Sequence, residues 1–140
     1  MAERVLTATV GERIELSVAT EDLSVRDPDD ARFRSIPVRT VWVKHQGPVG
    51  GEVEYIRHES NPEPEVPAGR GGGFGGRGRA AGPESISLAE GSGTARVYAT
   101  FSEPGEYIMR AQVDIFSATD SAAMDQCCWT NAYVRVNVSP

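Results

Sequence analysis

Residues 101–107 read FSEPGEY, and residues 108–113 continue as IMRAQV. The apolar run that ends at Phe101 predicts a strand, and the pair Pro104-Gly105 predicts a turn directly after it. A second alternating strand then begins at Tyr107. A tyrosine in this position is typical of a β-sandwich corner, where the ring packs under the turn and the hydroxyl bonds back to the turn backbone.

The rest of the chain supplies short strands with turn residues between them, and no helical window of useful length. In residues 13–19, Ile14, Leu16 and Val18 alternate with polar residues, as in a half-buried strand. Trp42 stands between Val41 and Val43, on the opposite strand face, and is predicted to lie in the core. The predicted strands are residues 5–10, 13–19, 38–44, 52–58, 85–88, 94–101, 107–115 and 132–138. This spacing predicts one all-β domain over residues 1–140, a sandwich of seven or eight strands with mainly antiparallel pairing.

Residues 61–83 interrupt this periodicity. Prolines stand at 62, 64 and 67, residues 70–79 read RGGGFGGRGR, and seven of the 15 glycines lie between 71 and 82. Glycine at this density loses much backbone entropy on ordering, so the segment is predicted to be a long mobile insertion between strands. If it orders against a partner surface, Phe74 and Arg77 are its candidate contact residues.

Charge and hydropathy exclude two classes of partner. The chain of 140 residues carries a net charge of −6, with an isoelectric point near 4.9. An acidic chain of this kind is not expected to bind nucleic acid, although an Arg/Gly element can bind RNA in other contexts. No window approaches the ~18 apolar residues that a membrane span requires.

Four pieces of the sequence resemble, in order, the PKD-like, immunoglobulin-like β-sandwich modules of bacterial secreted proteins. Residues 5–19 resemble the opening hairpin, with Gly11-Glu12 at its turn, and residues 41–48 resemble the third strand with its tryptophan and Gly-Pro turn. Residues 94–113 and 132–138 resemble the corner strands and the closing strand. The resemblance implies an immunoglobulin-like fold and an extracellular interaction, spacer or adhesion role. The N-terminus shows no apolar signal-peptide core, which fits either a cytoplasmic protein or a mature secreted chain. The resemblance favours an extracellular or periplasmic location, and a cytoplasmic one stays open.

Two adjacent cysteines, Cys127 and Cys128, depart from that family pattern. Neighbouring strand residues point to opposite faces, so only one of the two thiols can enter the core. Three alternatives stay open: a reduced pair with one buried member, a strained vicinal disulfide, and a cross-link to another chain or the binding of a metal by one or both thiols. A thiol nucleophile would need a base such as His45 or His58, both of which are expected to be solvated at strand ends.

Acidic loop residues suggest calcium as a possible cofactor. Glu21, Asp22, Asp114, Asp120 and Asp125 lie at strand ends or in loops that a sandwich can gather at one end. Calcium takes six to eight oxygen ligands, and these carboxylates could supply some of them. The alternative is that they are solvated loop carboxylates, because no Asp-x-Asp-x-Asp loop is present.

Trp129 precedes the last predicted strand, and Tyr133 lies near the start of that strand. Exposed rings in this position could stack on sugar rings, and the alternative is core or edge packing. The sequence therefore predicts a non-catalytic binding or assembly module whose partner is a protein surface, a carbohydrate or a second copy. Contacts would come from edge strands, from the loop with Cys127, Cys128 and Trp129, or from residues 61–83. Two rivals are a structural subunit of a homo-oligomer or filament, and a small enzyme or accessory subunit with its site near Cys127–Trp129.

Overall fold

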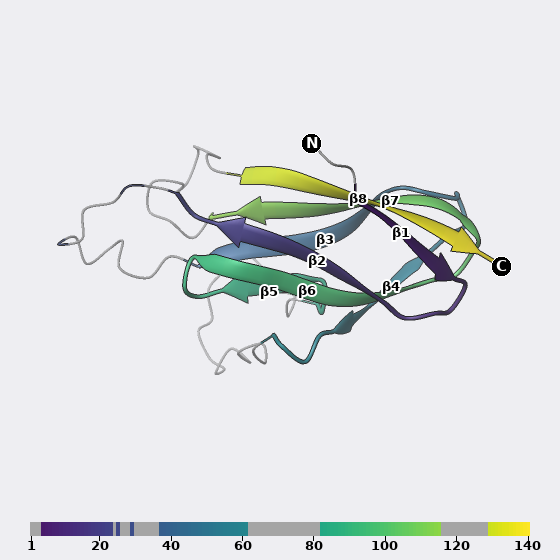
Figure 1. Cartoon of the computed structure of the whole chain (residues 1–140), viewed down its shortest axis with the longest axis horizontal. Coiled ribbons are helices and arrows are strands. Elements are labelled where there is room, and N and C mark those ends of the chain that lie inside the picture. The colour runs from purple at the N-terminus through teal and green to yellow at the C-terminus, as the bar shows by residue number, and fades with distance from the viewer. Residues whose placement is uncertain (1–3, 24, 26–28, 30–36, 62–81, 116–128) are drawn as a thin grey trace, which may run out of the picture.

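The computed structural model describes residues 4–23, 25, 29, 37–61, 82–115 and 129–140 (Figure 1). The regular structure of these residues is β only. The strands are β1 (Arg4–Thr9), β2 (Ile14–Glu21), β3 (Val38–Gln46), β4 (Val53–Arg57), β5 (Ser85–Leu88), β6 (Ser92–Phe101), β7 (Gly105–Asp114) and β8 (Trp129–Ser139). In this part of the chain, no helix has the length and apolar character of a membrane span.

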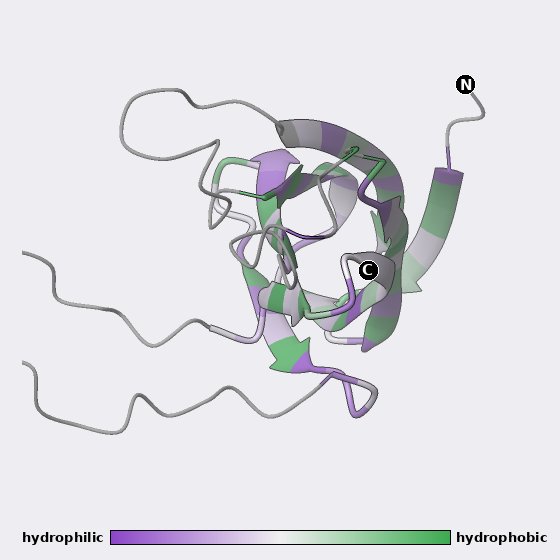
Figure 2. Cartoon of the chain, turned by 90° about the vertical axis from the view of Figure 1, so that its left-hand side faces the viewer, coloured by the Kyte–Doolittle hydropathy of each residue, from purple (hydrophilic) through white to green (hydrophobic). Residues whose placement is uncertain are grey.

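The strands form two sheets that pack face to face as a β-sandwich (Figures 1 and 2). The five-stranded sheet has the order β1-β8-β7-β3-β5, and the three-stranded sheet has the order β2-β6-β4. All pairs are antiparallel except β1 with β8, which run parallel. Among the described strands, β7 and β8 are the one consecutive pair joined in the same sheet, so the other connections cross between the layers.

The predicted opening hairpin of residues 5–19 is therefore wrong. β1 belongs to the five-stranded sheet and β2 to the three-stranded one. The turn between them bonds to both layers, because Val10 N–H donates to Ser139 O and Gly11 N–H donates to Phe101 O. Gly11 has a φ of 77°, which favours glycine, and this turn carries the chain across the sandwich instead of folding it back in one sheet.

The core lies between the sheets and uses the inward row of each strand. Its largest fully buried side chains include Leu16 from β2, Trp42 from β3, Phe101 from β6 and Tyr107 and Met109 from β7. The period-two alternation in residues 13–19 and 38–44 is confirmed, and so is the core position of Trp42.

The predicted corner at residues 101–107 is also confirmed. The Tyr107 hydroxyl donates to Glu103 O at 2.8 Å, and its ring packs against that of Phe101 with centroids 4.7 Å apart. The turn after β3 lies against the same ring: a Cβ on Gly51 would come within 2.3 Å of the Tyr107 hydroxyl. Lys44, the chain's single lysine, donates from Nζ to Pro48 O and Gly51 O and so fixes this turn.

Two predicted boundaries change. The last strand is predicted over residues 132–138, but β8 begins at Trp129, opposite Asp114 in register. The ends of the predicted 61–83 insertion are ordered: the Asn61 side chain donates to Arg96 O at 2.7 Å, and Ser85 N–H donates to Gly82 O at 3.0 Å. Residues 62–81, with Phe74 and Arg77, lie outside the described residues, so the predicted mobility stays a prediction.

Candidate functional site

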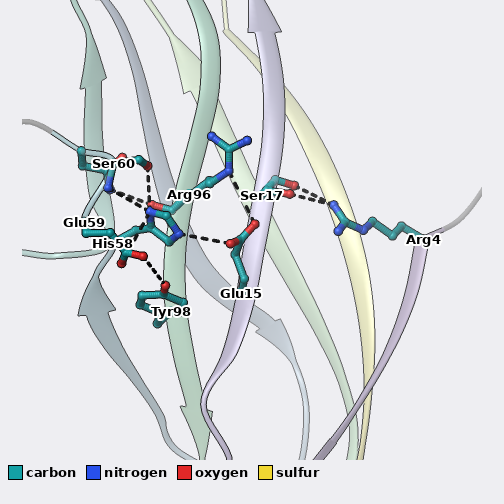
Figure 3. Close-up of polar contacts among 9 residues, drawn as sticks. Arg4, Glu15, Ser17, His58, Glu59, Ser60, Arg96 and Tyr98 are labelled. Atoms are coloured by element: carbon teal, nitrogen blue, oxygen red, sulfur yellow. Dashed lines mark hydrogen bonds and ion pairs between the residues drawn. The ribbon is translucent and has the colours of Figure 1, made fainter.

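The turn after β4 carries a buried histidine on the outer side of the three-stranded sheet (Figure 3). His58 is 7% exposed, which contradicts the expectation of a solvated ring. Asn61 N–H donates to His58 O at 3.1 Å and closes the turn. Ser60 N–H donates to His58 Nδ1 at 3.1 Å, so the imidazole accepts from the amide two residues on, as an Asx side chain does in its own turn.

This contact determines the tautomer of neutral His58. A backbone N–H can only donate, so Nδ1 must accept and the ring proton lies on Nε2. Nε2 then donates to Glu15 Oε2 at 3.1 Å, and the Ser60 hydroxyl lies 2.7 Å from Nδ1. Glu15 also meets Arg96, with 3.5 Å between Oε1 and Nε.

Tyr98 covers the ring of His58 and connects the cluster to its neighbours. The two ring centroids are 4.6 Å apart, and the Arg13 guanidinium carbon lies 4.5 Å from the Tyr98 centroid. The Tyr98 hydroxyl donates to Glu59 Oε1 at 2.9 Å, which raises the pKa of the phenol. The pKa of Glu59 is lowered, first by a backbone hydrogen bond and then by the Tyr98 hydroxyl.

The order Ser60–His58–Glu15 follows the nucleophile, base and orienting acid of a hydrolytic relay. A hydrolase also needs N–H donors for the developing oxyanion. The amides of Ser60 and Asn61 are both used inside the turn, by His58 Nδ1 and His58 O. These two amides are therefore engaged within the turn, and the cluster forms a hydrogen-bonded network that joins β2, β6 and the turn after β4.

Replacing His58 should measure the contribution of this network. We expect His58→Ala to lower the free energy of unfolding by about 1–3 kcal/mol, because it leaves the Ser60 amide without its acceptor and Glu15 Oε2 without its donor. His58→Asn should recover part of that loss, since its Oδ1 can accept from Ser60 N–H as in an Asx-turn. Urea unfolding of both variants tests this, with exposed His45→Ala as the matched control. Equal losses for alanine and asparagine would contradict the role of Nδ1 as an acceptor.

The outer face of the five-stranded sheet has a different character. Pairing places Val43, Arg110 and Tyr133 in one row across β3, β7 and β8. Tyr133 is 48% exposed, and Val5 on the edge strand β1 is 50% exposed. The His45 ring packs edge-on against Tyr133 with centroids 5.3 Å apart. We call this surface, comprising Val5, Val43, His45, Arg110 and Tyr133, the Tyr133 face.

The predicted calcium ligands do not form a metal site in the described part of the chain. β2 and β7 end on the same side of the sandwich (Figure 1), but no group of three potential ligands gathers there among the described residues. Asp114 is only 1% exposed and accepts from Arg39 Nη2 at 2.9 Å, which commits this carboxylate to an ion pair. Asp22 N–H donates to Gly91 O at the same side.

Several predicted site residues lie outside the described residues. These are Phe74, Arg77, Asp120, Asp125, Cys127 and Cys128, so a disulfide and a calcium site that uses the loop before β8 stay predictions. Trp129 is placed by its backbone at the start of β8, and Tyr133 lies four residues further along that strand.

The His58 network was missed by the sequence reasoning. Alternation already put Glu15 on the outer side of its strand, and His58 is the last residue of the predicted strand 52–58. Only the order β2-β6-β4 brings Glu15, Tyr98 and His58 together, because residues 15 and 58 are far apart in the chain.

A second feature without a sequence signal is Tyr55. Its hydroxyl is buried with no hydrogen-bond partner, and its pKa is raised, first by burial and then by the charge of Glu84. The pKa of Tyr55 is thus higher in the folded than in the unfolded protein. The stability that its buried neutral phenol contributes is complete below the ordinary tyrosine pKa of about 10, and it is lost as the pH rises through the folded-state pKa.

The pH dependence of Tyr55→Phe tests this burial. At pH 7 we expect its free energy of unfolding to lie within about 1 kcal/mol of wild type, because no hydrogen bond is lost. Between pH 10 and 12 the wild type should lose more stability than the variant, since only the wild type must keep this phenol neutral. Urea unfolding followed by circular dichroism at both pH values measures the difference. Identical losses in alkali would contradict the raised pKa.

Comparison with known proteins does not identify a family for this chain. The sequence matches no protein-family model, and a search of curated proteins finds no significant match. The class of protein is therefore given by the fold alone, which is an all-β chain of two packed sheets.

Proposed function

We propose that this protein is a non-catalytic binding or assembly module that contacts a protein partner through the Tyr133 face. The observation that carries the proposal is Tyr133 itself, a half-exposed ring beside Arg110 and His45 on a broad sheet. Tyrosine and arginine are enriched among the residues that dominate binding energy at protein interfaces. A pleated face also presents its side chains in fixed positions, which limits the entropy lost on association.

We also propose that the sandwich is of the immunoglobulin-like, PKD-like type. This assignment is supported by the Tyr107 corner and by the buried Trp42 on β3. The parallel pairing of β1 with β8 departs from the opening hairpin that the resemblance implied. A secreted binding role, outside the cytoplasm, follows from the resemblance and is proposed with it.

Self-association is the second candidate, because β1 ends the five-stranded sheet and exposes Val5 there. Edge strands of this kind can pair with another copy. Static light scattering, with and without reductant, separates the candidates. A 15.1 kDa species throughout favours a heterologous partner, and a larger species lost in Tyr133→Asp favours assembly through the same face.

Selection from a random peptide-display library tests the binding function directly. Amide chemical-shift changes caused by the selected peptides should cluster on β3, β7 and β8, and Tyr133→Asp should abolish binding while the protein stays folded. Tyr98→Phe, on the opposite sheet, is the matched control and should bind as wild type. Shift changes confined to the three-stranded sheet, or no selected binder, would refute the proposed face.

A further inference from the structure

Arg110 of the Tyr133 face forms no ion pair with the residues that the structure describes. Arg39 is bonded to Asp114 at 2.9 Å, and Arg135 lies 3.3 Å from Glu106, so both are neutralised within the sheet. In the described part of the chain, none of the ion pairs or hydrogen bonds uses Arg110, and its Nε is buried without a partner.

The position of Arg110 makes this unpaired charge significant. Arg110 is half-buried on the central strand β7, between Val43 of β3 and Tyr133 of β8 in the ladder. The Nε atom of Arg110 is buried and has no hydrogen-bond partner. Its two terminal nitrogens are not among the buried atoms without a partner, so they keep access to the surface. Apolar and aromatic neighbours lower the local dielectric, which strengthens a charge pair formed there.

We propose that Arg110 binds a carboxylate of an acidic protein segment, an Asp or Glu side chain flanked by apolar residues that pack on Tyr133 and Val43. This inference rests on the proposed function and names the chemistry of its partner. A guanidinium binds a carboxylate through two parallel N–H donors, and such pairs are stronger than neutral hydrogen bonds. The partner's carboxylate neutralises the charge of Arg110, and its apolar neighbours cover the exposed part of the Tyr133 ring.

The acidic character of the whole chain makes the interaction selective. The protein carries a net charge of −6, so an acidic partner is repelled at long range and gains nothing from nonspecific attraction. A segment that binds must therefore place its carboxylate at Arg110 itself. This requirement separates the proposal from a general electrostatic patch.

The test uses the full chain and peptides from the display selection. We expect the peptides that map to the Tyr133 face to carry Asp or Glu at a fixed position beside an apolar residue. Exchange of that Glu for Gln, or Arg110→Gln in the protein, should each weaken binding about tenfold, as expected for loss of one charge-assisted pair. The two changes together should weaken it no further, since both remove the same contact.

Two further variants keep the test decisive. Arg110→Lys should restore only part of the affinity, because an ammonium lacks the planar fork. Arg96→Gln, on the opposite sheet beside Glu15, is the matched control and should leave affinity unchanged. Thermal unfolding of each variant shows whether a loss of binding reflects loss of the fold.

The possible results distinguish the role of Arg110 from the binding function of the Tyr133 face. Peptides that bind the face equally well with Gln in place of Glu overturn the role of Arg110 and leave the binding function intact. Neutral saccharides that bind the face on a glycan array, in place of peptides, overturn the acidic protein partner. Absence of any binder on this face overturns both.

Discussion

Tyr107→Ala is expected to lower the free energy of unfolding by about 3–5 kcal/mol, the range for large-to-small changes of buried aromatic residues. The ring is fully buried, packs on Phe101 and lies under the turn that Lys44 holds. Its loss removes the support of the corner and of this turn together. Urea unfolding followed by circular dichroism measures the change.

Tyr107→Phe separates the ring from its hydroxyl. We expect a loss of about 1 kcal/mol, because the variant gives up only the hydrogen bond to Glu103 O. Gly51→Ala should cost about 1–3 kcal/mol, since its Cβ would lie 2.3 Å from that hydroxyl. The two changes should be non-additive, with Gly51→Ala costing less in the phenylalanine background. Strict additivity would show that the hydroxyl and Gly51 do not contact each other.

Trp42→Ala is the second change with a large expected effect, again about 3–5 kcal/mol for a fully buried aromatic side chain. Trp42 lies in the main core cluster at the centre of the sandwich. Because β3 pairs with both β5 and β7, a cavity here should weaken the whole five-stranded sheet. Equilibrium unfolding in urea gives the size of the loss.

Trp42→Phe tests whether the indole contributes through packing alone. The indole Nε1 is buried without a hydrogen-bond partner, so phenylalanine loses packing but no hydrogen bond. We expect a cost of about 1–2 kcal/mol from the smaller volume alone. A loss as large as that of alanine would contradict the unpartnered indole. Tyr107→Phe gives the contrasting case, in which the lost atom has a partner.

These stability changes affect binding only indirectly. Tyr107 and Trp42 face the core, whereas Arg110 and Tyr133 lie on the outer side of the same sheet. Conservative variants of the core should thus change the unfolding midpoint while leaving peptide affinity near wild type, and Arg110→Gln should do the reverse. This separation makes the Tyr133 face a suitable place to test function.

Sequence patterns within one strand or one turn predicted the features that depend on that strand or turn alone. The alternation in residues 13–19 gave the inward row of β2, and residues 101–107 predicted both the turn and the hydrogen bond of Tyr107. Each of these depends on neighbours close in the chain. The candidate site was predicted only in part, because Tyr133 was identified and Arg110 was not.

The sequence by itself determined the all-β class of fold, the approximate positions of the strands and the core position of Trp42, because a period of two separates the two faces of every strand. Tertiary structure decided which strands pair, since short links can fold back or cross between layers. It placed β1 in parallel beside β8 and brought Glu15 to His58. It also left Arg110 unpaired while Arg39 and Arg135 found carboxylates, a difference set by neighbours across the sheet and invisible along the chain.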